Sequence, residues 1–98
     1  MGKQLEFLTS QESIVIFGCG IKGKALLTLL NGMRERIIAF SDNNSALWGK
    51  SVEGIRIFPP EVLAQKYRES CVVIANRQNA DEIYHQLRDM NISNLYII

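Results

Sequence analysis

A short apolar run followed at once by three glycines constrains the fold of this chain more than any other feature of its sequence. The stretch from Ser13 to Leu30 reads SIVIFGCGIKGKALLTLL, with glycines at positions 18, 20 and 23. Apolar residues recur at spacings of three and four from Ile21 to Met33, as they do in an amphipathic helix. A buried strand, a G-x-G-x-x-G turn and a helix in this order are typical of the phosphate-binding turn of Rossmann-type domains.

The rest of the chain continues the alternation of apolar strands and amphipathic helices. Strands are predicted at 36–42, 55–58, 71–75 and 95–98, and helices at 61–70 and 80–90. Arg56 alternates with apolar neighbours, so its strand is expected at or near an edge, and Asn79 and Glu82 resemble a capping box. We therefore predict an α/β fold: a doubly wound, Rossmann-like parallel sheet of five strands in the order 3-2-1-4-5, with helices on both faces.

Length and composition predict one globular domain that acts through a local site. The 98 residues are enough for a single domain, 1–98, with its core at 13–98. A net charge of +1 predicts binding neither to nucleic acid nor to an anionic membrane. We expect a cytoplasmic protein without membrane insertion, because no apolar run approaches the roughly 20 residues of a membrane span. Two cysteines without further ligands at metal spacing predict neither a disulfide framework nor a metal site.

Each glycine of the turn has a predicted physical role. Gly18 permits the tight turn after the strand, Gly20 lets a pyrophosphate approach the backbone, and Gly23 lets the helix pack closely. Asp42 stands 19 residues after Gly23, where the Rossmann fingerprint places an acid that accepts hydrogen bonds from a ribose. The free N–H groups and the dipole of the helix N-terminus then favour phosphate at this turn.

Further candidate residues flank the turn, each with a structural alternative. Ile21 and Lys22 lie within the turn, and Asn76 and Arg77 follow a strand at the carboxyl edge, where open α/β sheets bind ligands. For the two cations, a solvated charge is the favoured alternative to ligand contact. Trp48 is expected either to pack its loop onto the domain or to cover the site. Cys19 is expected near a helix N-terminus that lowers its pKa, although a small packed residue is the favoured interpretation.

Four segments of the sequence resemble a known family over about residues 12–98. They read IVIFGCGIKGKALLTLL, IIAFSDNN, WGKSVEGIRIFPPEVL and CVVIANRQNADEI, with the F-S-D-N of 40–43 and the G-K-x-x-x-G-I-x-I of 49–57 as the most telling parts. They are similar to the Rossmann-like nucleotide-sugar-binding domain attached to PglD-type bacterial sugar acyltransferases. Similar CoA-binding-like domains precede membrane-associated nucleotide-sugar dehydratases and phosphoglycosyltransferases.

The resemblance implies a ligand and a set of contacts. It implies a UDP-sugar or NAD(H) at Gly18, Gly20 and Gly23, with Asp42 and Asn43 near the nucleoside. The acyltransferases continue into a left-handed β-helix, which this sequence lacks. Catalysis that depends on that second domain is therefore not expected of this chain.

Three functions remain open from the sequence. The favoured one is a nucleotide-binding module that holds a UDP-sugar for a sugar-modifying transferase, either as a homodimer or with a fused or partner catalytic domain. The second is the NAD(H)-binding half of a sugar dehydratase or epimerase. No Tyr-x-x-x-Lys pair is present to support it, since Tyr67 is followed by Cys71 and Tyr84 by Arg88. The third is an NAD- or CoA-sensing regulatory domain, which would use the same turn.

Overall fold

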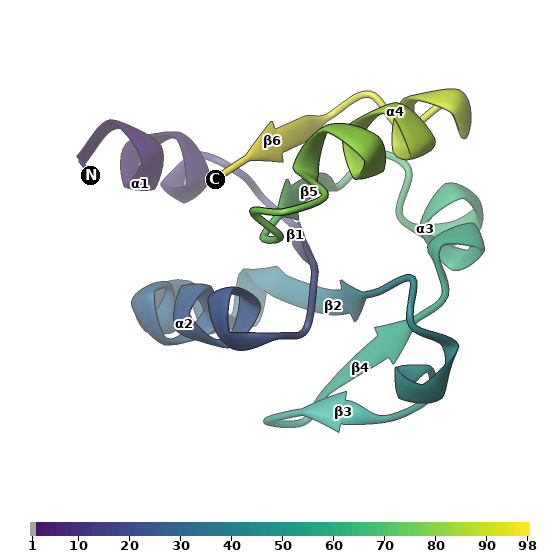
Figure 1. Cartoon of the computed structure of the whole chain (residues 1–98). Coiled ribbons are helices and arrows are strands. Elements are labelled where there is room, and N and C mark those ends of the chain that lie inside the picture. The colour runs from purple at the N-terminus through teal and green to yellow at the C-terminus, as the bar shows by residue number, and fades with distance from the viewer. Residues whose placement is uncertain (1) are drawn as a thin grey trace.

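The computed structural model describes residues 2–98, and they form an α/β fold with a six-stranded sheet (Figure 1). The strands are β1 (Ile14–Phe17), β2 (Ile37–Ser41), β3 (Ser51–Val52), β4 (Ile55–Phe58), β5 (Cys71–Ile74) and β6 (Leu95–Ile97). The α-helices are α1 (Gly2–Thr9), α2 (Ile21–Leu29), α3 (Pro60–Lys66) and α4 (Ala80–Asp89), and two 3₁₀ segments are η1 (Asn31–Arg36) and η2 (Ser45–Leu47).

The sheet order is β3-β4-β2-β1-β5-β6. The five strands β4, β2, β1, β5 and β6 are parallel and have the predicted order 3-2-1-4-5. The sixth strand, β3, was not predicted and pairs antiparallel with β4 at the sheet edge. Glu53 and Gly54 have φ angles of 50° and 85° between these two strands. Two successive positive φ angles are typical of the tight hairpin turns that reverse a chain within two residues.

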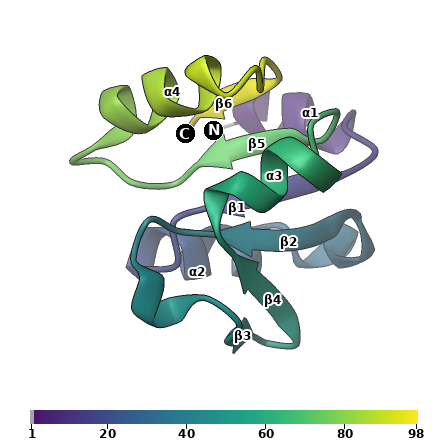
Figure 2. The ribbon, with the colours of Figure 1, turned by 90° about the vertical axis from the view of Figure 1, so that its right-hand side faces the viewer.

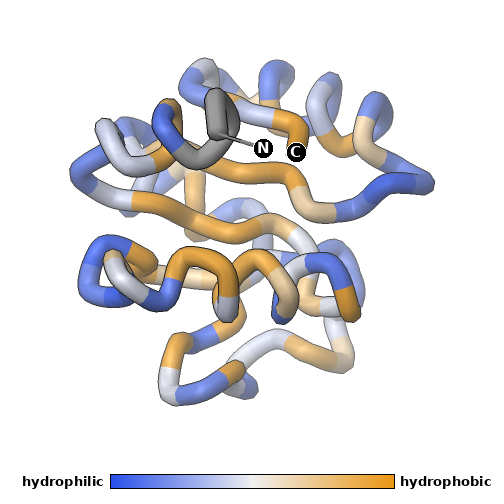
Figure 3. The backbone as a smooth tube through the Cα atoms, turned by 90° about the vertical axis from the view of Figure 1, so that its left-hand side faces the viewer, coloured by the Kyte–Doolittle hydropathy of each residue, from blue (hydrophilic) through white to orange (hydrophobic). Residues whose placement is uncertain are grey.

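Helices cover both faces of the sheet (Figure 2), and apolar segments gather in its strands (Figure 3). Side chains of β1 alternate between the two layers: Ile14 and Ile16 join the core beneath α1 and α2, and Val15 and Phe17 join the core beneath α3 and α4. All four are at most 1% exposed. Burial on both faces explains why this strand reads as a continuous apolar run.

Helix α1 is the largest difference from the sequence prediction, which placed no element before residue 13. Leu8 is fully buried in the core beneath α1 and α2, and the ring of Phe7 stacks on Tyr96 with centroids 4.6 Å apart. Arg36 Nη1 donates a hydrogen bond of 2.6 Å to the carbonyl oxygen of Thr9. These contacts hold a helix whose local sequence is mainly polar.

Two other elements also differ from the predictions. The helix expected to reach Met33 ends at Leu29, because the 3₁₀ segment η1 begins at Asn31, and within it Met33 does not have helical φ and ψ angles. The register of β2 shifts between Ile37 and Ala39, which leaves Ile38 unpaired and 37% exposed. The extra residue of this bulge is therefore apolar but not buried.

The capping box predicted at the start of α4 does not form. Asn79 occupies the N-cap position, but its side chain makes no capping hydrogen bond. Asn76 Oδ1 instead accepts a hydrogen bond of 3.1 Å from the backbone N–H of Asn79. The start of α4 is thus held by a side chain of the loop that follows β5, and not by the side chain of its own N-cap residue.

Candidate functional site

The carboxyl ends of β1, β2 and β5 meet at one edge of the sheet and surround an open cleft of about 570 Å³. This is the edge at which ligands bind in open α/β sheets. We call this space the main cleft; its lining comes from three loops: Gly18, Cys19, Gly20, Ile21, Lys22, Asp42, Asn44, Leu47, Ala75, Asn76, Arg77 and Gln78. The fold therefore brings seven of the nine predicted site residues together, all except Gly23 and Asn43.

Two glycines of the turn are required by the fold itself. Gly18 has a φ of +116°, and a Cβ placed there would lie 2.7 Å from the carbonyl oxygen of Ala75. A Cβ at Gly23 would overlap with the carbonyl oxygen of Gly18, so only glycine lets α2 lie this close to the turn. The backbone N–H of Gly18 donates to the carbonyl oxygen of Ser41 at 2.8 Å, which fixes the turn to the end of β2.

Gly20 differs from the other two because the free fold does not require it. A Cβ placed at Gly20 would meet no atom within 4 Å, and its φ of −82° is accessible to any residue. Gly20 is the N-cap of α2, and no side chain caps this helix. The first N–H groups of a helix have no intrahelical acceptor, and together with the helix dipole they favour an anion.

Asp42 connects the turn to the loop after β2. Its Oδ2 accepts a hydrogen bond of 3.0 Å from the backbone N–H of Cys19, and its Oδ1 accepts one of 2.9 Å from Asn44. A carboxylate oxygen can accept a second hydrogen bond, so the half-buried side chain keeps acceptor capacity toward the cleft. Asp42 therefore has a structural role that the sequence analysis did not foresee, next to the predicted ribose contact.

Trp48 holds the loop after β2 in place. Its Nε1 donates a hydrogen bond of 2.7 Å to the main-chain carbonyl oxygen of Asp42. The residue does not belong to the lining of the main cleft. Of the two alternatives, packing of the loop onto the domain agrees with this contact.

The two predicted cations occupy different positions. Lys22 Nζ donates a hydrogen bond of 2.6 Å to the carbonyl oxygen of Ile98, so its charge is directed toward the end of β6. Arg77 is exposed at the rim of the main cleft. Of these two predicted cations, Arg77 alone can approach a ligand in the cleft without first breaking such a hydrogen bond.

Cys19 is buried between the turn and β2, and the prediction of a lowered pKa is wrong. Burial, together with the charge of the neighbouring Asp42 carboxylate and a hydrogen bond to it, raises the pKa of the Cys19 thiol to about 12, while Lys24 opposes the shift. Burial also raises the pKa of Cys71 to about 11. Both cysteines are free thiols.

Residues 2–98 contain no group of three or more His, Cys, Asp or Glu side chains that could hold a metal ion. None of the helices described is long and apolar enough to cross a membrane.

A second cleft of about 510 Å³ adjoins the main cleft and shares Gly18, Asp42 and Asn76 with it. We call it the side cleft; its other lining residues are Phe17, Asn43, Asn79, Glu82, Ile83 and Gln86. The sequence analysis gave Asn43 as a residue near the nucleoside only through the resemblance, and it missed the contribution of α4. One signal in the sequence could have shown this contribution. Positions 79, 82 and 86 are spaced to lie on one face of the helix that follows a buried strand.

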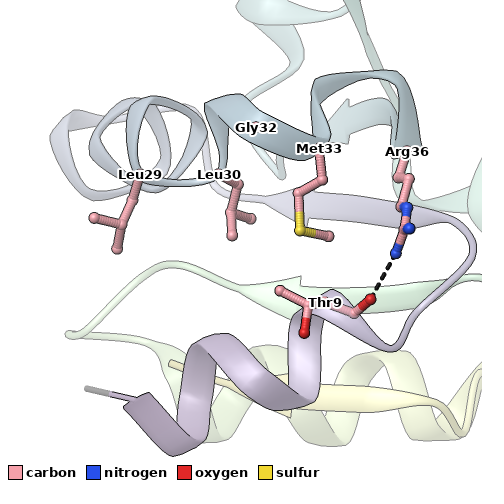
Figure 4. A pocket seen from close by; sticks show the side chains of 6 residues that line it. All are labelled: Thr9, Leu29, Leu30, Gly32, Met33 and Arg36. Atoms are coloured by element: carbon pink, nitrogen blue, oxygen red, sulfur yellow. Dashed lines mark hydrogen bonds between the residues drawn. The ribbon is translucent and has the colours of Figure 1, made fainter.

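An apolar cavity of about 400 Å³ lies elsewhere, between the end of α1 and the segment from α2 to η1 (Figure 4). Leu29, Leu30 and Met33 line one wall. The polar groups at its end, Arg36 and Thr9, are already bonded to each other. This cavity contains no residue of the glycine turn.

Residues 10–98 match the model of a protein family described as C2185-like, N-terminal. No curated protein matches the sequence. Among solved structures, UDP-D-quinovosamine 4-dehydrogenase from Vibrio fischeri is similar, with a TM-score of 0.70 and 25% identity over 90% of this chain and 78% of that chain. RSP, a Rex-family repressor, aligns with a TM-score of 0.69 and 15% identity over 98% of this chain and 49% of that chain, a similarity of fold alone.

These similarities confirm the Rossmann-like fold. They do not show that the domain is of the kind attached to sugar acyltransferases, and that relationship remains a prediction.

Proposed function

This chain belongs to the C2185-like N-terminal domain family, and we propose that it is a nucleotide-binding module that holds the diphosphate of a UDP-sugar at its glycine turn. The observation that carries the proposal is the contrast among the three glycines. The fold needs Gly18 and Gly23 but leaves the space beside Gly20 open, at an uncapped helix N-terminus. A glycine that the fold does not need, at this position, favours the close approach of a phosphate.

The charges of the main cleft support a nucleotide as the ligand. Arg77 lines the main cleft as an exposed cation that would contact phosphate, while Asp42 lies at the opposite loop and has acceptor capacity for the hydroxyl groups of a ribose. Lys22 would have to exchange the carbonyl of Ile98 for a phosphate oxygen. In this arrangement Gly18, Gly20, Ile21, Lys22 and Gly23 surround the diphosphate, Asn76 and Arg77 close the rim, and Asp42 and Asn43 face the nucleoside.

The sugar part of the proposal is supported by similarity. The dehydrogenase from Vibrio fischeri acts, by its name, on a UDP-sugar and shares 25% identity over 90% of this chain. Within that proposal, the module serves a sugar-modifying transferase of polysaccharide biosynthesis in the cytoplasm. The catalytic groups would come from a partner domain or a second copy.

NAD(H) is the second candidate, and the position of Asp42 is the observation that favours it. A dinucleotide also places its diphosphate at such a turn, and an acid after the second strand accepts the ribose hydroxyls of NAD. The negative charge of Asp42 would repel the 2′-phosphate of NADP. A module that binds NAD(H) would be the cofactor-binding part of a sugar oxidoreductase or a regulatory sensor.

The test is a thermal-shift screen of the purified chain with UDP, UDP-N-acetylglucosamine, NAD, NADP and CoA. Ligand at 100 times its dissociation constant stabilises the fold by about 2.7 kcal/mol, which raises the Tm by roughly 11–22 °C in a domain of this size. We expect a shift with the UDP ligands that Asp42→Ala removes. Asp89→Ala, an exposed acid at the end of α4, is the matched control and retains the shift.

Other outcomes of the same screen decide between the candidates. A shift with NAD but not with NADP or the UDP ligands would replace the UDP-sugar by NAD(H). A shift with CoA alone would support a CoA sensor. No shift with any of the five would contradict nucleotide binding at this turn.

A further inference from the structure

The side cleft adjoins the cleft in which the proposed nucleotide lies. It shares Gly18, Asp42 and Asn76 with the main cleft, so a ligand at these three residues can contact both clefts. Figure 2 shows the segment after β2 and the segment that enters α4 at the same end of the molecule. The side cleft lies between these two segments.

Charge separates the parts of a ligand between the two clefts. The main cleft contains Lys22 and Arg77 beside the shared Asp42, whereas the charged residues that line the side cleft, Asp42 and Glu82, are both acidic. Phosphate is therefore favoured in the first and repelled from the second. The part of the ligand that enters the side cleft is uncharged.

The side cleft is lined mainly by polar side chains. The amides of Asn43, Asn79 and Gln86 stand around it, whereas its apolar lining residues Phe17 and Ile83 are only 1% and 4% exposed. A nucleobase has an edge of alternating hydrogen-bond donors and acceptors. Amides suit this edge, because Asn and Gln present one donor and one acceptor side by side.

Two of these amides are bonded to each other across the cleft. Asn43 Nδ2 donates to Gln86 Oε1 at 2.9 Å, and Gln86 Nε2 donates to Asn43 Oδ1 at 2.9 Å. This pair joins the loop after β2 to α4 over 43 positions of the sequence. Each amide keeps one N–H and one acceptor lone pair beyond the pair, and an amide that exchanges its partner for a base edge can form two hydrogen bonds with the base in place of the two of the pair.

We propose that Asn43 and Gln86 select the base of the bound nucleotide by hydrogen bonds to its edge in the side cleft, an inference that rests on the nucleotide binding proposed above. The pair closes the side cleft when no base is present and opens when one enters. The module then distinguishes uracil from adenine by the donors and acceptors that these amides offer. Asp42 and the glycine turn make no such distinction, because ribose and diphosphate are the same in both nucleotides.

The experiment compares UDP with ADP, which differ only in their base. Dissociation constants are measured by isothermal titration calorimetry for the wild type, Asn43→Ala, Gln86→Ala and Gln86→Glu. The wild type is expected to prefer one of the two nucleotides at least about fivefold, as one bidentate amide–base contact provides. Each alanine variant should bring the ratio of the two constants close to one, mainly by weakening the preferred nucleotide.

Two further variants make the result specific. Gln86→Glu keeps the shape and the acceptor of the side chain but removes its donor, so it should change the ratio even if an alanine variant does not fold. Gln65→Ala on α3, an exposed glutamine outside both clefts, should leave both constants unchanged.

The possible failures are distinguishable. If the variants weaken UDP and ADP by the same factor, the pair only shapes the loop, and the inference is wrong while nucleotide binding stands. The same holds if the wild type binds both nucleotides equally or if no variant changes either constant. If the wild type binds neither nucleotide, the proposed function fails and this inference with it.

Discussion

Substitution of Gly20 by alanine should separate the binding function of the glycine turn from its structural function. A Cβ at this position meets no atom within 4 Å, and the backbone conformation is accessible to alanine. The free energy of unfolding should therefore stay within about 1 kcal/mol of the wild type, because the gain from a less flexible unfolded chain is opposed by the lower preference of alanine for the N-cap position. Gly23→Ala should instead lower it by about 1–3 kcal/mol, because the added atom overlaps with the carbonyl oxygen of Gly18.

The effect of Gly20→Ala on ligand binding should be large. The methyl group occupies the approach of the phosphate to the helix N–H groups, and the loss of a charged hydrogen bond costs about 1.5–3 kcal/mol. We take a 100-fold weaker dissociation constant as the expected size. At a ligand concentration of 100 times the wild-type constant, the stabilisation then falls from about 2.7 to about 0.4 kcal/mol, and the rise in Tm falls from roughly 11–22 °C to about 2–3 °C.

The assay is a pair of melts, with and without the ligand that stabilises the wild type most. Gly32→Ala is the matched control, because a Cβ there also meets no atom within 4 Å and the residue lies in η1, outside both clefts. It should keep both the stability and the ligand shift. If Gly20→Ala keeps the full ligand shift, the phosphate does not lie at this turn, and the argument from the three glycines is refuted.

Two further predictions concern the residues that hold the turn. Asp42→Asn should lower the free energy of unfolding in urea by about 1–2 kcal/mol, because an amide cannot accept from both Cys19 N and Asn44 N; a loss below about 0.5 kcal/mol would contradict this role. The Cys19 thiol has a pKa of about 12 in the fold and 9.0 as its ordinary value, so the unfolded chain ionises first and stability should decline from about pH 9 toward pH 12. This thiol contributes at most about 1.4 kcal/mol per pH unit, and Cys19→Ala should flatten the decline measured in urea between pH 8 and pH 10; an equally steep decline in the variant would show that other groups cause it.

The central part of the fold could be predicted because the residue types at its positions reflect the burial and the backbone conformation there. Strand β1 is buried on both faces and is therefore continuously apolar, and Gly18 and Gly23 stand where the backbone leaves no room for a Cβ. The order of the five parallel strands follows from the handedness of the crossovers. These features depend on interactions close in sequence or on general rules of chain geometry.

Other parts of the fold depend on contacts that no local sequence pattern predicts. Helix α1 is held by buried Leu8 and by the stacking of Phe7 on Tyr96, a residue near the other end of the chain. The two residues of β3 are too few to form a recognisable alternation. Similarly, the pairing of Asn43 with Gln86 requires the loop after β2 to meet α4, so the side cleft became visible only in three dimensions.

The central position of β1 has a consequence for synthesis on the ribosome. One edge of β1 pairs with β2, which follows it closely, but the other edge pairs with β5, in which Cys71 lies opposite Ile14, 57 residues later. At about 5–20 residues per second, the ribosome needs roughly 3–11 s to make that partner. During this interval the nascent chain presents an apolar strand with an unpaired edge. Such an edge can pair with other chains, so the segment is one that chaperones have to protect during synthesis.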